Sequence, residues 1–247
     1  MRRAGGLLFL LAIWQLLSLC FPGGLAVASP LESLRTLFSL AGTTAFWQRV
    51  LLSSVHIVLG FLLAVLGGAA AAVLSFHVPV IEALLVPLIA LMKSVPIAIV
   101  VILLLILFSS SGIAPAVVVL AAFPLLYTAF LTGARSADGK LLEMAHVFRW
   151  SEGRKWRWIR LPAAREHLTS ALRVASGMAW KAGVSAEVLG TPRGSIGEAL
   201  YGAKIYLATE ELFAWAAVIL LLGWLMERLS LLLLNGLYRF NLRRAGV

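Results

Sequence analysis

Long runs of apolar residues constrain the fold of this chain more than any other feature of its sequence. A membrane-spanning helix needs about 20 consecutive, mainly apolar residues. Segments of this kind cover residues 5–21, 50–76, 80–108, 113–132, 168–189 and 212–234. Charged residues make up only 13% of the 247, against about 25% in a soluble domain. The sequence therefore predicts an all-α, polytopic membrane protein with about six transmembrane helices, embedded in the lipid bilayer.

The distribution of lysine and arginine predicts how these helices are oriented. Basic residues gather in three regions: 2–3, 135–165 and 239–244. Six crossings would place all three regions on one side of the membrane, which the positive-inside rule assigns to the cytoplasm. This arrangement accounts for the net charge of +10 without nucleic acid as a partner. We therefore expect a multi-pass protein of the cytoplasmic membrane with both termini in the cytoplasm.

One transmembrane domain, residues 1–247, is expected for a chain of this length. Within it, residues 1–48 would form the first helix and an external loop, and residues 235–247 a cytoplasmic tail. Residues 49–234 would form the core helices, interrupted by a cytoplasmic loop at 135–167. The N-terminus has a second interpretation, because Arg2-Arg3, an apolar run and Ala26-Val27-Ala28 resemble a cleaved secretory signal. We favour a retained helix, since the rest of the chain is itself polytopic.

The third apolar run is too long for one simple span and contains Lys93-Ser94-Val95-Pro96. Proline removes a helical hydrogen bond and disfavours helical angles at the residue before it. The sequence therefore predicts a short interfacial helix over residues 80–92, followed by a span that begins at Pro96.

The loop at 135–167 is a polar, basic island between apolar segments. Its first part shows helical spacing, with Leu141, Leu142, Ala145 and Phe148 on one face. Ser151 is expected to cap a second short helix that begins near Glu152, and Pro162 to end this segment before the fifth span. Composition alone leaves open whether the loop only sets the topology or docks a soluble partner.

The spacing within this loop resembles the EAA loop of ABC importer permeases. Glu143, Ala145, Ile159, Leu161 and Pro162 stand at matching positions of a pattern that reads Glu-Ala-Ala, three residues, Gly, nine residues and Ile-x-Leu-Pro. The chain departs from it twice, with Met144 in place of the middle alanine and Arg149 in place of the glycine. Residues 179–190, 194–197 and 212–215 are similar to permeases of the nitrate, taurine and aliphatic-sulfonate class. The resemblance covers about residues 50–228.

This resemblance implies a set of partners. Two copies of such a permease surround one path, two ATPase subunits bind ATP and Mg²⁺ beneath them, and an extracytoplasmic binding protein delivers the solute. No cofactor is expected in this chain itself. The residues that would couple to the ATPase are Glu143, Ala145, Phe148, Arg149, Gly153, Ile159, Leu161 and Pro162. Because arginine adopts left-handed backbone angles less readily than glycine, we expect the turn to shift toward residues 151–153 or to use an ordinary conformation.

An ionisable residue inside an apolar span costs free energy when the helix enters the bilayer, so its presence there needs an explanation. Lys93, Lys181 and Glu187 are the main candidates for lining the solute path, with His56 and Glu82 as weaker ones. A path lined by lysine would suit an anion such as nitrate or a sulfonate. The alternative is that each side chain reaches an interface or pairs within the bundle. Lys181 and Glu187 lie about 120° apart around a helix, so they are not expected to pair.

Small residues on the second span, Gly60, Gly67, Gly68 and Ala69–Ala72, permit close helix contact. We expect ordinary packing within the bundle, with a dimer or gating contact as the alternative.

The sequence contains no pattern of catalytic or metal-binding residues. It has no P-loop, no His-Glu-x-x-His and no Gly-x-Ser-x-Gly, and its only aspartate, Asp138, lies in a predicted loop. We therefore expect a transport subunit rather than an enzyme. A stand-alone secondary transporter would need coupling-ion residues or inverted repeats, and neither is visible. Within the permease class the solute stays open, and a vitamin precursor or an amino acid is the alternative to an anion.

Overall fold

The computed structural model describes residues 2–20, 27–107 and 110–243, and these residues form helices joined by short turns. The end of the first apolar run at Phe21, the possible cleavage site at Ala26, and Phe108 and Arg244 lie outside the described residues. In chain order the elements are α1 (Arg2–Cys20), α2 (Pro30–Ala41), α3 (Thr44–His77), α4 (Pro79–Ser94), α5 (Ile97–Leu107), η1 (Ser110–Gly112), α6 (Ile113–Arg135), α7 (Gly139–Val147), α8 (Glu152–Lys155), η2 (Trp156–Arg160), α9 (Leu161–Ala163), α10 (Arg165–Gly190), α11 (Ile196–Ile205) and α12 (Thr209–Arg243). The all-α fold is therefore confirmed.

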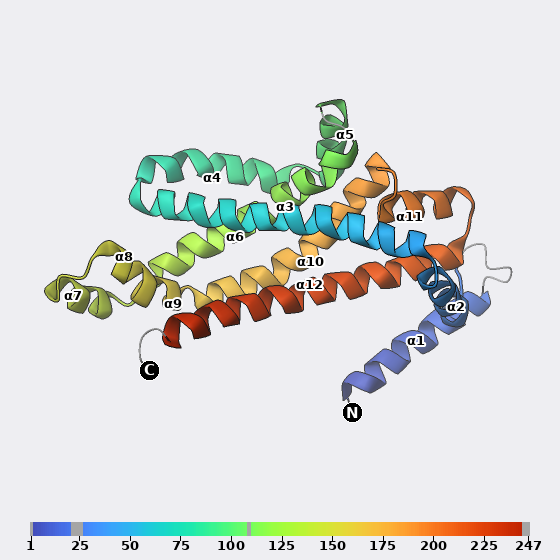
Figure 1. The fold of residues 1–247 in the computed structure, drawn as a ribbon, viewed down its shortest axis with the longest axis horizontal. Coiled ribbons are helices and arrows are strands. Elements are labelled where there is room, and N and C mark those ends of the chain that lie inside the picture. Colours follow the sequence, from blue (N-terminus) through green and yellow to red (C-terminus); the bar gives the residue numbers. More distant parts are fainter. Residues whose placement is uncertain (1, 21–26, 108–109, 244–247) are drawn as a thin grey trace.

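Four long helices run along the long axis of the molecule (Figure 1). Helix α6 packs on both α3 and α10, and α10 also packs on α12. Among the described residues, α3, α6 and α12 are long and apolar enough to cross a membrane, and a bent pair, α4 with α5, could form a fourth span. Helix α10 is more polar, yet it carries many of the buried residues of the bundle. It can be polar because it is largely covered by its neighbours rather than by lipid.

The third apolar run breaks where the sequence predicts it. Val95, the residue before Pro96, has φ −76° and ψ 126°, and the helices on either side of it meet at 103°. The longer part, α4, packs against α3 and α6, while α5 points in a different direction and packs against α6 and the end of α10 (Figure 1). The prediction that a span begins at Pro96 is wrong. A helix of 11 residues is roughly 17 Å long, which is too short for a hydrocarbon core of about 30 Å.

Glycines allow α3 to approach α6 and α10 very closely. A Cβ atom added at Gly60 would lie 2.6 Å from the carbonyl oxygen of Pro115, and one added at Gly68 would lie 3.1 Å from the nitrogen of Tyr127. At Gly183 of α10 it would lie 2.6 Å from Ile57. These glycines pack within one subunit, as expected for ordinary bundle packing.

Two short helices close the end of the bundle that lies opposite α7 (Figure 1). Helix α2 begins with a capping box, in which the Glu32 carboxylate accepts hydrogen bonds from the Ser29 hydroxyl at 2.7 Å and from its backbone N–H. These bonds lower the pKa of Glu32. Ser195 caps the start of helix α11, and its hydroxyl accepts a hydrogen bond from the N–H of Glu198.

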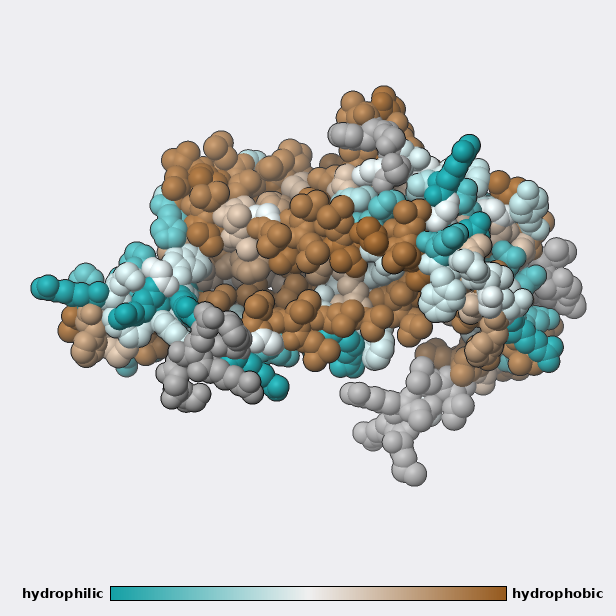
Figure 2. All heavy atoms as spheres, in the orientation of Figure 1, coloured by the Kyte–Doolittle hydropathy of each residue, from teal (hydrophilic) through white to brown (hydrophobic). Residues whose placement is uncertain are grey.

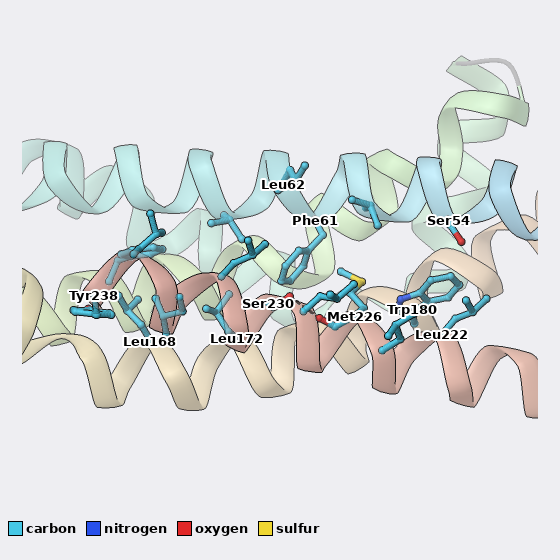
Figure 3. A pocket seen from close by; sticks show the side chains of 18 of the residues that line it. Ser54, Phe61, Leu62, Leu168, Leu172, Trp180, Leu222, Met226, Ser230 and Tyr238 are labelled. Atoms are coloured by element: carbon cyan, nitrogen blue, oxygen red, sulfur yellow. Dashed lines mark hydrogen bonds between the residues drawn. The ribbon is translucent and has the colours of Figure 1, made fainter. Parts of the chain in front are cut away.

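The outer surface is apolar along the middle of the molecule and hydrophilic toward its two ends, as Figure 2 shows. This is the pattern of a protein surrounded by lipid. An apolar groove of about 530 Å³ runs between α3 and α12 over α10 (Figure 3). Phe61, Leu172 and Met226 line its middle, Tyr238 lies at the end nearest α9, and Trp180 lies toward the opposite end.

Candidate functional site

The loop between α6 and α10 contains a short helix, α7, with defined ends. The Asp138 carboxylate caps its start by accepting a hydrogen bond from the N–H of Lys140 at 2.9 Å. At its end, Trp150 N–H donates to the carbonyl of Ala145 at 2.8 Å, and Arg149 N–H donates to that of His146 at 2.9 Å. This pair of bonds is a Schellman motif, which requires a left-handed residue at the position of Arg149.

Arg149 adopts that conformation, with φ 51°. Both expectations for this turn are therefore wrong: it has not moved to residues 151–153, and it does not use an ordinary conformation. The backbone hydrogen bonds of the motif hold the left-handed angles that glycine would adopt at lower cost.

The surface of α7 is unusually apolar for a segment beyond the membrane spans. Only Ala145 is fully buried, whereas Leu141, Val147 and Phe148 are 46%, 76% and 68% exposed. The predicted apolar face is therefore not a buried face, because Leu141 and Phe148 point away from the rest of the chain. Exposed apolar side chains on such a small helix are typical of an interaction surface.

The second part of the loop is a continuous series of helical turns. Ser151 stands at the N-cap position of α8, but its hydroxyl makes no capping bond, and its carbonyl accepts from Arg154 and Lys155 instead. Lys155 donates to the Glu152 carboxylate at 2.7 Å and lowers its pKa. Pro162 does not end the segment as expected, because proline is tolerated in the first turn of a helix, and α9 continues to Ala163.

Three long helices hold this second part in place. Arg160 lies over the ring of Phe76 at 4.2 Å, and the Trp156 ring lies 5.1 Å from the same ring, at the end of α3. Tyr238 of α12 donates a hydrogen bond of 2.7 Å to the carbonyl of Leu161. On α6, Gly133 packs so tightly against Ala164 that an added Cβ would lie 2.7 Å from the alanine methyl group. A force on the loop would therefore reach α3, α6 and α12.

A hollow of about 450 Å³ lies between α7 and the turns that follow. It is lined by Leu142, Glu143, His146, Val147, Lys155 and Arg160. Glu143 is exposed and makes no ion pair within the part of the chain that the structure describes. The loop therefore presents an unpaired carboxylate, two cations and apolar side chains on one surface.

The other predicted loop residues have different positions. Ile159 is buried at 6% exposure and belongs to the base of the loop together with Ala145. Gly153 is exposed on α8, and Leu161 is 38% exposed.

The predicted path residues are not brought together. Lys93 is exposed at the end of α4, and Lys181 is exposed on α10. Glu187 is only 1% exposed, inside one subunit. Lys181 and Glu187 form no ion pair, as their angular separation predicts. Of the weaker candidates, Glu82 makes a two-pronged ion pair with Arg135.

The buried carboxylate of Glu187 joins three helices. It accepts hydrogen bonds from the Ser53 hydroxyl of α3 at 2.6 Å and from the Gly197 N–H of α11 at 3.4 Å. Ser53 in turn accepts from the N–H of Ile196 at 2.9 Å. The Nδ1 atom of His56 lies 3.6 Å from the second carboxylate oxygen. Neither that oxygen nor His56 Nδ1 has a hydrogen-bond partner among the described residues, so Ser53 and Gly197 supply the carboxylate's hydrogen bonds. Removing Ser53 would leave a further buried polar group unpaired, which is costly.

A cavity of about 500 Å³ lies beside this cluster, at the end of the bundle opposite α7. Leu52, His56, Ser110, Gly190, Thr191, Pro192 and Arg193 line it. Arg193 was not among the residues expected to line the path, although its position directly after Gly190-Thr191-Pro192 is evident from the sequence.

Comparison with known proteins assigns the chain to a family. Residues 56–245 match the model of the binding-protein-dependent transport system inner membrane component. The chain belongs to this family. It is therefore an integral membrane protein and the permease subunit of an ABC importer, a transport component rather than an enzyme. Such importers work with an ATPase and a binding protein, and the sequence-based expectation of this family is confirmed.

Individual relatives cover nearly the whole chain. It is 27% identical to the taurine transport system permease protein TauC of Escherichia coli (strain K12), over 90% of this chain and 83% of the relative. It is 26% identical to the putative aliphatic sulfonates transport permease protein SsuC of Bacillus subtilis (strain 168), over 94% and 84%. A probable ABC transporter permease protein of Haemophilus influenzae is 28% identical, over 89% and 92%.

Proposed function

We propose that this permease docks its ATPase through the surface formed by α7 and the hollow beside it. The observation that carries the proposal is that α7 exposes apolar side chains and the unpaired Glu143, while the turns that follow are fixed to three long helices. A docking element needs both properties, because it must bind a partner and pass that partner's movement to the membrane domain.

The proposed complex has two copies of this chain around one path and two ATPase subunits beneath them. The whole chain acts as one transmembrane domain with cytoplasmic termini in the cytoplasmic membrane, which is supported by the basic residues near α1, in the loop and in the tail. ATP and Mg²⁺ bind to the ATPase. Its closure can switch the path only if the docked ATPase favours one state of the permease over the other.

We infer that the solute is a small organic anion, in particular a sulfonate. The names of TauC and SsuC, which refer to taurine and aliphatic sulfonates, support this class. The exposed cations Lys93 and Lys181 are proposed to face the path, and Glu187 to support the walls of the path near its external end.

Co-purification of this chain with the ATPase that accompanies it tests the docking surface. We expect Glu143→Lys to weaken the complex about tenfold or more, because it places a third cation beside Lys155 and Arg160 and reverses the charge offered to the partner. Glu210→Lys, the same charge reversal on an exposed residue at the opposite end of the bundle, is the control and should retain the ATPase. Equal retention by both variants would remove Glu143 from the docking surface.

A further inference from the structure

The cavity beside Thr191 and Arg193 has the features of a binding site for a small anion. We propose that it binds the sulfonate group of the solute at the external end of the path, with Arg193 as the main cationic contact and His56 as the opposite wall. This inference rests on the proposed function, since it assigns a place to the anionic solute in this chain. It involves residues other than the lysines expected from the sequence.

Arg193 is exposed, makes no ion pair within the described residues, and lines the cavity. Its position is fixed by the turn that carries it. Thr191 has left-handed angles, with φ 41°, and its N–H donates to the carbonyl of Glu187 at 2.7 Å. Pro192 is buried, and its carbonyl accepts a bond from the N–H of Ser195. A guanidinium group on a rigid turn can donate two parallel hydrogen bonds to an oxyanion with little loss of entropy.

His56 lies beside the buried cluster. Its Nδ1 lies 3.6 Å from Glu187, beyond hydrogen-bonding distance, and Glu187 is itself held by Ser53 and Gly197. Because His56 also lines the cavity, its ring supplies a polar wall for a solute.

The lining favours an anion with a short carbon chain. None of the described residues that line the cavity is acidic, whereas Arg193 supplies a permanent positive charge. Ser110 and Thr191 contribute hydroxyl groups, and Leu52 and Pro192 contribute apolar surface. The volume of about 500 Å³ lies within the range of roughly 300–1,000 Å³ found for small-molecule sites. A sulfonate head with a small alkyl tail matches both the charge and the apolar surface.

The location of the cavity agrees with this role. Helix α10 has 26 residues and is roughly 39 Å long, so its two ends can reach opposite sides of a bilayer about 30 Å thick. The docking loop lies at its beginning and the cavity at its end (Figure 1). A solute released by an external binding protein would therefore meet this cavity before the middle of the bundle.

The test measures binding of ethanesulfonate to the detergent-purified permease–ATPase complex, without binding protein, in a ligand-observed NMR titration. We expect Arg193→Gln to raise the Kd about tenfold or more, the usual effect of losing hydrogen bonds to a charged group. Arg193→Lys should recover part of the affinity. Lys204→Gln removes an exposed cation from the neighbouring α11 and should leave the Kd unchanged. Co-purification of the ATPase with each variant confirms that it is folded.

A second measurement separates this inference from the proposed function. Uptake of ethanesulfonate into proteoliposomes is followed with saturating, loaded binding protein. The wild type could take up ethanesulfonate while the titration detects no binding, or gives a Kd that Arg193→Gln does not change. That outcome would overturn the cavity as the sulfonate site and leave the proposed function intact. Absence of uptake of any sulfonate by the wild type would overturn the proposed solute class, and the cavity assignment with it.

Discussion

At the scale of single residues, Arg149 shows how a family position can keep its conformation without its usual residue. A left-handed residue other than glycine costs about 1–2 kcal/mol. The cost is tolerated here because two backbone hydrogen bonds, from Arg149 to His146 and from Trp150 to Ala145, close the end of α7. The exposed arginine side chain adds no hydrogen bond or ion pair to the turn. A substitution at Arg149 can therefore relieve the backbone strain.

Arg149→Gly should stabilise the docking loop by about 1 kcal/mol, because glycine adopts left-handed angles without a steric penalty. Slower hydrogen exchange of the Trp150 amide, measured in detergent, would report the change. Arg149→Ala also removes the charge but retains the penalty, so it should show no such slowing. If the two variants behaved alike, the effect would come from the charge and not from the backbone.

Glu187 shows a limit of sequence-based inference at the same scale. Its position in an apolar span marked it as unusual, and that much was predictable. Its partners were not, because Ser53 is 134 residues away and Gly197 lies beyond a turn. Only the packing of α3 and α11 against α10 places these donors around the carboxylate.

At the scale of elements, the long apolar helices were predictable because each carries its own signal. The short helices α2 and α11 were missed, although both begin with the sequence Ser-x-x-Glu, at Ser29–Glu32 and Ser195–Glu198. This is the pattern of a helix start, but neither helix is long enough to give the hydrophobic signal of a membrane span. The break at Pro96 was predictable from local chemistry, but the 103° bend between α4 and α5 depends on how α4 packs on α3 and α6.

The close contact of α3 with α6 predicts that two glycine-to-alanine substitutions in α3 have different effects on stability. Gly60→Ala should destabilise the protein by about 1–3 kcal/mol, since the new methyl group would overlap the Pro115 carbonyl. Gly67→Ala should be neutral or stabilise by up to about 1 kcal/mol, because its Cβ would lie an ordinary 3.7 Å from Phe123 and alanine favours the helix. Thermal unfolding in detergent measures both. Equal melting temperatures for the two variants would contradict the packing described here.

At the scale of the whole molecule, α3 connects the two functional ends. Phe76 at one end contacts Trp156 and Arg160 of the docking loop. Toward the other end, Ser53 donates a hydrogen bond to the buried Glu187 carboxylate, and His56 lies 3.6 Å from it, beside the cavity at Arg193. The distance along the helix from Ser53 to Phe76 is roughly 35 Å. A single helix of 34 residues, packed closely on α6 and α10, can therefore move both ends together.

Removing the contact between α3 and the loop after α7 should uncouple ATP hydrolysis from transport. Phe76→Ala removes the ring that contacts Trp156 and Arg160 but changes none of the residues that line the hollow. We expect the ATPase to co-purify normally, while solute taken up per ATP falls about two- to thirty-fold, the range for losing about 0.5–2 kcal/mol of coupling. Leu74→Ala, at a residue of the same helix that is 53% exposed, is the control and should transport normally. If both variants took up the same amount of solute per ATP, the contact at Phe76 would not be needed for coupling. The loop would then transmit its movement to α6 through Ala164 and to α12 through Tyr238.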